Sequence, residues 1–317
     1  MLLPRRSPVL LCAALVVLAL PASAPAKINV AVGLGDQSAK MFDNSNYKAL
    51  GIKKVRYFIH WDAATNTDQL KKAEDFVEAA NKSGAKVLMH ISTNNLKEYA
   101  AKLPTLKEYE LAIAALIEKF KPLGVKEWGV WNEANHKTQP TYKSPKAAAQ
   151  FYKAMKARCS GCTIVALDVL DQQGVESYIK RWLAAAGSAG KSAKIIGIHN
   201  YSEVNRRIKK GTNRYPGTGR IIKALRTKNK KAKFWYTETG GVVNFGRAFA
   251  CNMTRPVSRT KFLFGLVKKF KKDVARLYNY NFTGADCNGF DAGLTNADGT
   301  ARPAYKEFKK QLKNHAR

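Results

Sequence analysis

Apolar runs rich in β-branched residues recur along the whole chain, and segments with the spacing of amphipathic helices lie between them. The helical pattern is clear at 67–84, 106–124, 144–159 and 174–187, each with Gly or Pro near an end. The apolar runs number eight: 28–34, 53–59, 85–92, 125–132, 163–169, 193–201, 232–238 and 274–282. Such near-continuous apolar strands suit a parallel sheet covered by helices, and eight strand–helix units predict a (β/α)8 TIM barrel.

An open, doubly wound sheet is the alternative arrangement of the same units. The count of eight weighs against it, and the glycines after the first run, in "GLGDQS" (residues 33–38), do not follow the G-x-G-x-x-G spacing of a dinucleotide site. The chain has 317 residues and no low-complexity linker. We therefore predict one α/β domain over residues 27–317, preceded by a targeting segment.

Polar side chains stand where five of the apolar runs end. In a parallel barrel the carboxyl ends of the strands meet on one face, and functional groups gather there. The residues concerned are His60, Trp61, His90, Asn132, Glu133, Asn135, His199, Tyr201 and Glu238. A carboxylate at the tip of a buried strand is costly without a task or a partner, so Glu133 and Glu238 are the main candidates for chemistry.

Two carboxyl groups facing each other can cleave an acetal. One delivers a proton to the departing oxygen, and the other stabilises or attacks the oxocarbenium-like centre. A separation of about 5 Å predicts retention of anomeric configuration, and roughly 6.5–9.5 Å predicts inversion. Each glutamate alone also fits an ordinary carboxylate at a strand end, and only their pairing favours catalysis.

The motifs "WNEAN" (131–135) and "TETGG" (237–241) resemble those of clan A glycoside hydrolases, the 4/7 superfamily, most closely families 39 and 5. The resemblance implies a retaining O-glycosyl hydrolase with Glu133 as acid/base and Glu238 as nucleophile. It also implies that Asn132 holds the sugar 2-hydroxyl. Neither a cofactor nor a metal is expected.

Other positions match the same clan singly. "RYFIHW" resembles the second strand of family 5, which implies that Arg56 lies beneath the nucleophile, and His90 stands where family 5 often has a histidine. His199 and Tyr201 resemble an H-x-Y pair whose tyrosine binds the nucleophile. We also expect Trp61 and Asn135 to bind substrate. The clan usually has a tryptophan at the end of strand eight, and Tyr280 or Phe282 would replace it here. For His90 and His199, a core histidine satisfied by its neighbours is the alternative.

The N-terminus has the layout of a cleaved secretory signal over residues 1–26, with Arg5 and Arg6 before an apolar core and small residues after it. We therefore expect a secreted, extracellular protein with no membrane segment after cleavage. Four cysteines remain in the mature chain. In an oxidising compartment they predict disulfides, Cys159 with Cys162 and Cys251 with Cys287, rather than a metal site. A redox C-x-x-C motif is the alternative for the first pair.

The chain carries 55 basic and 23 acidic residues, a formal net charge of +32. The lysines are scattered through helical segments and form no nucleic-acid motif, so no specific nucleic-acid partner is expected. A basic segment after the sixth run (Arg206, Arg207, Lys209, Lys210 and Arg214) could bind an acidic polymer, or simply be a solvated surface. We expect a monomer acting on an oligo- or polysaccharide. The rival functions are a non-catalytic carbohydrate-binding barrel and a cationic cell-wall adhesion protein.

Overall fold

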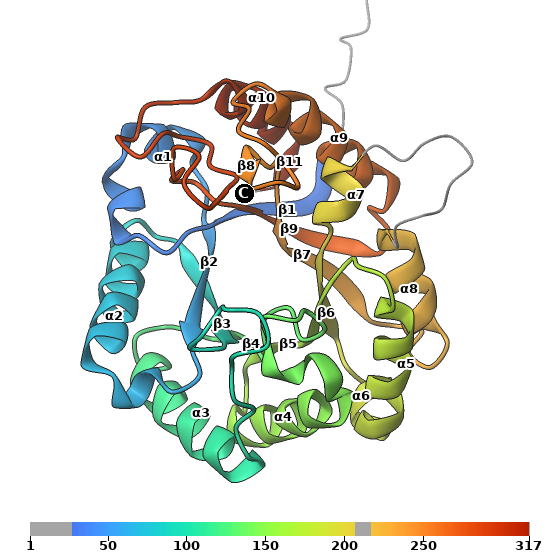
Figure 1. The fold of residues 1–317 in the computed structure, drawn as a ribbon. Coiled ribbons are helices and arrows are strands. Elements are labelled where there is room, and N and C mark those ends of the chain that lie inside the picture. The colour runs from blue at the N-terminus through green and yellow to red at the C-terminus, as the bar shows by residue number, and fades with distance from the viewer. Residues whose placement is uncertain (1–26, 207–216, 317) are drawn as a thin grey trace, which may run out of the picture.

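A closed barrel of eight parallel strands forms the centre of the protein, with helices around it (Figure 1). The computed structural model describes residues 27–206 and 217–316. The barrel closes because the first strand pairs with both the second and the last. In barrel order the strands are β1 (Ile28–Gly35), β2 (Lys54–His60), β3 (Lys86–Ser92), β4 (Glu127–Gly129), β5 (Thr163–Leu170), β6 (Ile195–His199), β7 (Lys233–Thr239) and β9 (Val274–Tyr280). The predicted (β/α)8 barrel is confirmed, and each predicted apolar run supplies one strand.

The helices begin and end at recognisable signals. Thr105 and Glu108 form a reciprocal capping box at the start of α3 (Leu106–Phe120), and Ser144 caps α4 (Pro145–Arg158), whose first residue is a proline. The larger helices are α2 (Thr67–Lys82), α3 (Leu106–Phe120), α4 (Pro145–Arg158), α5 (Val175–Ala186), α8 (Thr218–Arg226), α9 (Arg255–Lys269) and α10 (Pro303–Leu312). The shorter ones are α1 (Ser45–Leu50), α6 (Ser188–Lys191), α7 (Tyr201–Asn205) and the 3-10 turns η1 (Ala39–Asp43), η2 (Ala63–Thr65) and η3 (Pro140–Lys143). Among the described residues, no helix has the length and apolar character needed to cross a membrane.

The fourth strand is shorter than its sequence predicts. Regular pairing stops at Gly129, although the run was expected to continue to Asn132. The chain still follows the gap between β3 and β5, because the amide of Val130 donates to Val165 and that of Asn132 donates to Ile91. Glu133 therefore remains at the carboxyl end of the barrel, but in a turn with a φ of 43°.

The opposite, amino-terminal end of the barrel is closed by a charged group stacked on an aromatic ring. The guanidinium of Arg276 lies 3.7 Å from the ring centroid of Trp235 and hydrogen-bonds Glu127. Lys54 reaches the same carboxylate at 3.8 Å. Arg276, Trp235, Glu127 and Lys54 are here called the plug. Trp235 packs with the apolar side chains of Leu88, Val165 and Tyr278, and Arg276 donates to the Tyr278 hydroxyl.

The long loops at the carboxyl end are tied to one another. A two-stranded antiparallel ladder pairs β8 (Asn244–Phe245), after β7, with β10 (Phe290–Asp291), after β9. The Cys251–Cys287 disulfide joins the same two loops, and Cys159–Cys162 closes the turn between α4 and β5. Both cysteine pairs are those expected from the sequence. A final short strand, β11 (His315–Ala316), pairs with β1 on the outside of the barrel.

Candidate active site

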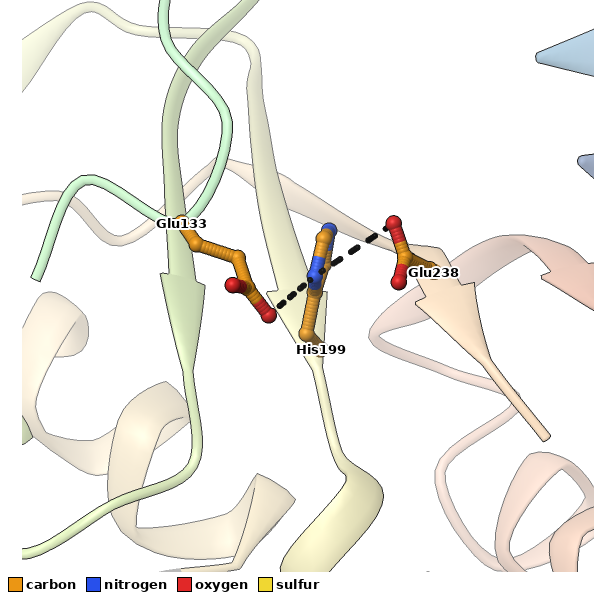
Figure 2. A group of neighbouring side chains, drawn as sticks. All are labelled: Glu133, His199 and Glu238. Atoms are coloured by element: carbon orange, nitrogen blue, oxygen red, sulfur yellow. Dashed lines mark hydrogen bonds and ion pairs between the residues drawn. The ribbon is translucent and has the colours of Figure 1, made fainter. Parts of the chain in front are cut away.

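Glu133 and Glu238 face one another across the mouth of the barrel, with His199 between them (Figure 2). One oxygen of each carboxylate and a ring nitrogen of His199 all lie within 4.8 Å of one another. Glu238 lies inside β7, whereas Glu133 stands four residues beyond β4. Their residual exposure is small, 17% and 11% of the side chain. The two sequence-predicted carboxylates thus form one compact, largely buried pair.

Arg56 holds Glu238 from below. Its guanidinium donates to Glu238 Oε2 at 2.8 Å and to Asn132 Oδ1 at 2.5 Å. It is only 1% exposed, and it points into the barrel because alternate residues of β2 face inward. This buried cation fixes the orientation of the Glu238 carboxylate at one of its oxygens.

Tyr201 holds the other oxygen of the same carboxylate. Its hydroxyl donates to Glu238 Oε1 at 3.0 Å. Burial, reinforced by the charge of Glu238, raises the pKa of Tyr201 well above its usual value, so the phenol keeps its proton. Glu238 is therefore fixed at both oxygens by donors from β2 and from the start of α7.

His199 is held as a cation by the carboxylates around it. Its Nδ1 lies 3.0 Å from Glu133 Oε1, and its Nε2 lies 2.8 Å from Asp168 Oδ2. Burial alone would lower the pKa of His199, but the charges of Asp168 and Glu238 raise this pKa to about 10. Both ring nitrogens then carry protons, and the Nδ1 proton points at Glu133.

The protonated imidazole also acts on Glu133. Burial raises the pKa of the Glu133 carboxyl, but the hydrogen bond and charge of His199 outweigh burial and hold this pKa below its ordinary value. The two residues thus share one proton, which lies on His199 in the unliganded site. Because only 3.0 Å separates the two atoms, the proton can pass directly between them.

Asp168 is a third carboxylate of the site, and the sequence analysis missed it. It is fully buried in the middle of β5, accepts a hydrogen bond from Thr237, and lies 3.3 Å from the amide of Glu133. The opposing position is glycine because a β-carbon on Gly197 would lie 1.9 Å from Asp168 Oδ1. A lone acid inside the apolar run "TIVALDVL" was the available signal, since a buried charge requires a partner.

His90 supports Arg56 from within the barrel. It is fully buried, accepts from Arg56 Nε at 3.2 Å, and packs so close to the backbone of Gly129 that a β-carbon there would overlap its ring. Burial lowers the pKa of His90 to about 3, and the positive charges of Arg56 and His199 add to this effect. His90 is therefore neutral and fully buried against Arg56 and Gly129, which is closer to the core-histidine alternative than to a sugar ligand.

The other expected substrate ligands occupy different depths. Asn135 has a structural role, because its side-chain amide donates to the carbonyl of Leu170 and accepts from the amide of the same residue. Trp61 is half-buried at the end of β2 with its indole nitrogen unpaired, and Tyr280 is half-buried at the end of β9. Of the two residues expected to replace the strand-eight tryptophan, Tyr280 is the better placed, because Phe282 is buried in the core. In the basic segment after β6, residues 207–216 lie outside the described residues.

Glu133, His199 and Glu238 are also the type of ligands that bind a divalent cation. A protonated imidazole has no free lone pair for a metal, and Asp168 stabilises the proton on His199. This donor set therefore fits a proton shared with Glu133 better than a metal ion.

No family model matches the sequence, and a search of curated proteins found no match. The fold, however, is that of solved clan A glycoside hydrolases. A β-glucosidase of Thermotoga maritima shares 11% identity at a TM-score of 0.60, covering 88% of this chain and 87% of that one. An endoglucanase of Pseudomonas stutzeri shares 16% sequence identity at a TM-score of 0.60, and the match covers 92% of this chain and 97% of that one. A family 113 β-1,4-mannanase shares 13% sequence identity at a TM-score of 0.57, and the match covers 91% of this chain and 99% of that one. These likenesses establish the barrel fold.

Proposed function

We propose that this protein is a secreted, retaining glycoside hydrolase that cleaves O-glycosidic bonds of a β-linked oligo- or polysaccharide. The observation that carries the proposal is the separation of no more than 4.8 Å between carboxylate oxygens of Glu133 and Glu238. An inverting enzyme needs roughly 6.5–9.5 Å between its carboxyls to admit a water, whereas a retaining pair stands about 5 Å apart. The β-glucosidase and β-1,4-mannanase with similar folds support a β-linked substrate.

In the first step Glu238 attacks the anomeric carbon, and the bond from that carbon to the leaving oxygen breaks. The shared proton passes from His199 Nδ1 to Glu133 and from there to the leaving oxygen, so Glu133 ends this step as a carboxylate. Arg56 and Tyr201 keep the attacking carboxylate correctly oriented until it forms the glycosyl ester. Asn132, fixed by Arg56, is placed to hold a hydroxyl group of the reacting sugar.

In the second step water replaces the leaving group. Glu133 removes a proton from that water, the oxygen bonds to the anomeric carbon, and the ester to Glu238 breaks. Two displacements on one carbon restore the original configuration. The proton returned to the Glu133–His199 pair resets the site, so the pair acts as acid and base in turn.

Secretion is part of the proposal and is supported by the signal-like pattern of residues 1–26 and by two disulfides. The test is hydrolysis of a panel of aryl β-glycosides and β-linked polysaccharides, with the anomer of the first product identified by NMR. Glu133→Gln and Glu238→Gln should each lose about 10³-fold or more in kcat while staying folded. Glu118→Gln, an exposed acid on α3, is the matched control.

Sustained turnover in either site variant, or an inverted product, would exclude this mechanism. Binding of sugars without hydrolysis by the wild type would favour the carbohydrate-binding barrel. Binding that disappears with salt and ignores sugar identity would favour the cationic adhesion protein.

A further inference from the structure

A line of aromatic rings leads from the catalytic pair to the surface. Tyr201, which binds Glu238, contacts the ring of Phe290 edge-on at 5.4 Å, and Phe290 contacts Phe245 at 5.5 Å. Tyr280 lies on the other side of Phe290, with nearly parallel ring planes and centroids 6.3 Å apart. Tyr201, Tyr280 and Phe290 are half-buried, whereas Phe245, at the end of the line, is 52% exposed.

The loops that carry these rings are rigidly held. Phe245 and Phe290 are directly paired in the β8–β10 ladder. Asn244 donates to the carbonyls of Cys287 and Gly289 at 2.9 and 2.6 Å, and the Cys251–Cys287 disulfide links the same loops covalently. An exposed aromatic ring on a fixed backbone can bind a ligand at little cost in conformational entropy.

Two arginines that make no ion pair with the described residues lie near the outer end of this line, Arg247 in the turn after Phe245 and Arg255 against Phe249. Arg247, at the tip of the turn between Phe245 and Phe249, is exposed and makes no ion pair with the described residues. Arg255 lies 5.3 Å from the Phe249 ring and donates only to the backbone carbonyls of Val242 and Val243. Burial lowers the pKa of Arg255, and the charge of Arg259 lowers it further, as expected where cations are not neutralised.

The acidic groups of these loops do not compensate this charge. Asp286 and Asp291 both pair with Arg302, at 3.0 and 2.7 Å. The outer edge therefore combines an apolar ring face, suited to a pyranose, with a guanidinium suited to a carboxylate.

We propose that Tyr280, Phe290, Phe245 and Arg247, here called the aromatic shelf, form a subsite beyond the catalytic centre that binds a uronate unit of a β-linked acidic polysaccharide. The inference rests on the proposed function, because it extends the same substrate outward from Glu238. The exposed ring of Phe245, supported from behind by Phe290, would stack on a sugar face, and Arg247 would pair with the carboxylate of the same or the next unit.

Binding measured in the catalytically blocked Glu238→Gln protein tests the shelf without any hydrolysis. The two probes are β-linked mannuronate oligosaccharides and the same oligosaccharides after reduction of their carboxyls to the neutral mannose form. We expect tighter binding of the acidic probe. In the Glu238→Gln protein, the additional change Arg247→Gln should lower the affinity for the acidic probe by up to about fivefold and leave the affinity for the neutral probe unchanged. Phe245→Ala should weaken both probes by about fivefold or more.

Two control variants match these changes outside the shelf. Arg181→Gln removes an exposed guanidinium from α5, and Phe262→Ala removes a 44% exposed ring from α9. Equal affinity for the two probes, or shelf variants no weaker than their controls, would overturn the proposal. These binding measurements need no turnover, so they are independent of the test of the proposed function. If the wild type hydrolysed no glycoside, the proposed function would be wrong. A positive binding result would still support the aromatic shelf as a binding site.

Discussion

His199 Nε2 lies 2.8 Å from Asp168 Oδ2, and this buried ion pair determines the charge at the centre of the site. Through it, an acid that cannot reach a substrate affects the proton that Glu133 uses. Asp168 is therefore a positioning residue, and its effect should appear in the pH dependence of the reaction as well as in the rate.

Asp168→Asn should move the alkaline limb of the kcat/KM profile to lower pH by about 1 to 3 units. The charge of Asp168 helps to raise the pKa of His199 to about 10, so its loss lowers this pKa and the shared proton leaves earlier as pH rises. The measurement is the pH profile on an aryl β-glycoside the wild type accepts. Asp68→Asn, at the exposed start of α2, is the control. An alkaline limb unchanged from wild type would contradict the role of Asp168.

The same pair makes stability depend on pH. The pKa of His199 is about 10 in the folded protein and about 6.5 when unfolded, so its protonation stabilises the fold fully below about pH 6.5. That contribution is lost as pH rises toward 10. We therefore compare the unfolding free energies of the wild type and of His199→Asn, measured in urea titrations. The wild type should be the more stable at pH 6, and this difference should fall by about 2 to 4 kcal/mol between pH 6 and 9.5. A difference independent of pH would show that His199 is neutral.

The two ends of the barrel should respond differently to loss of a carboxylate. Glu127→Gln removes the charge that holds Arg276 and Lys54 at the closed end, far from the mouth. We expect a loss of about 2 kcal/mol in unfolding free energy, because a charged hydrogen bond is weakened. Activity per folded molecule should stay at the wild-type level. A large fall in kcat without a fall in stability would contradict the structural role of the plug.

The two disulfides should differ in their contributions to stability. Cys251 and Cys287 are 36 residues apart, whereas Cys159 and Cys162 are only 3 apart. Loop-closure entropy in the unfolded chain predicts a loss of about 4 kcal/mol for replacing the first pair with serine and about 2 kcal/mol for the second. Chemical denaturation of both double variants is the measurement. Only the first replacement should also weaken oligosaccharide binding, since it frees the loops of the aromatic shelf.

Much of this protein follows directly from its sequence. Eight apolar runs alternating with amphipathic helices determine the barrel, because each parallel strand needs helical cover and a crossover connection. The same pattern places Glu133, His199 and Glu238 on one face, since the carboxyl ends of parallel strands share an edge of the sheet. Alternation within β2 places Arg56 on the face opposite to that of Val55 and Tyr57, and the resemblance to family 5 implied that this face is the inner one.

Only the tertiary structure determined how these groups interact. The distance between the two glutamates depends on the size of the barrel and on the turn after β4, where Glu133 adopts a φ of 43°. The separate depths of His90 and His199 depend on packing inside the barrel, with space left by Gly129 and Gly197. The charge state of His199 depends on Asp168, which is distant in the sequence. Local propensity carries information about a residue's own backbone, whereas electrostatic coupling depends on which strands the closed barrel brings together.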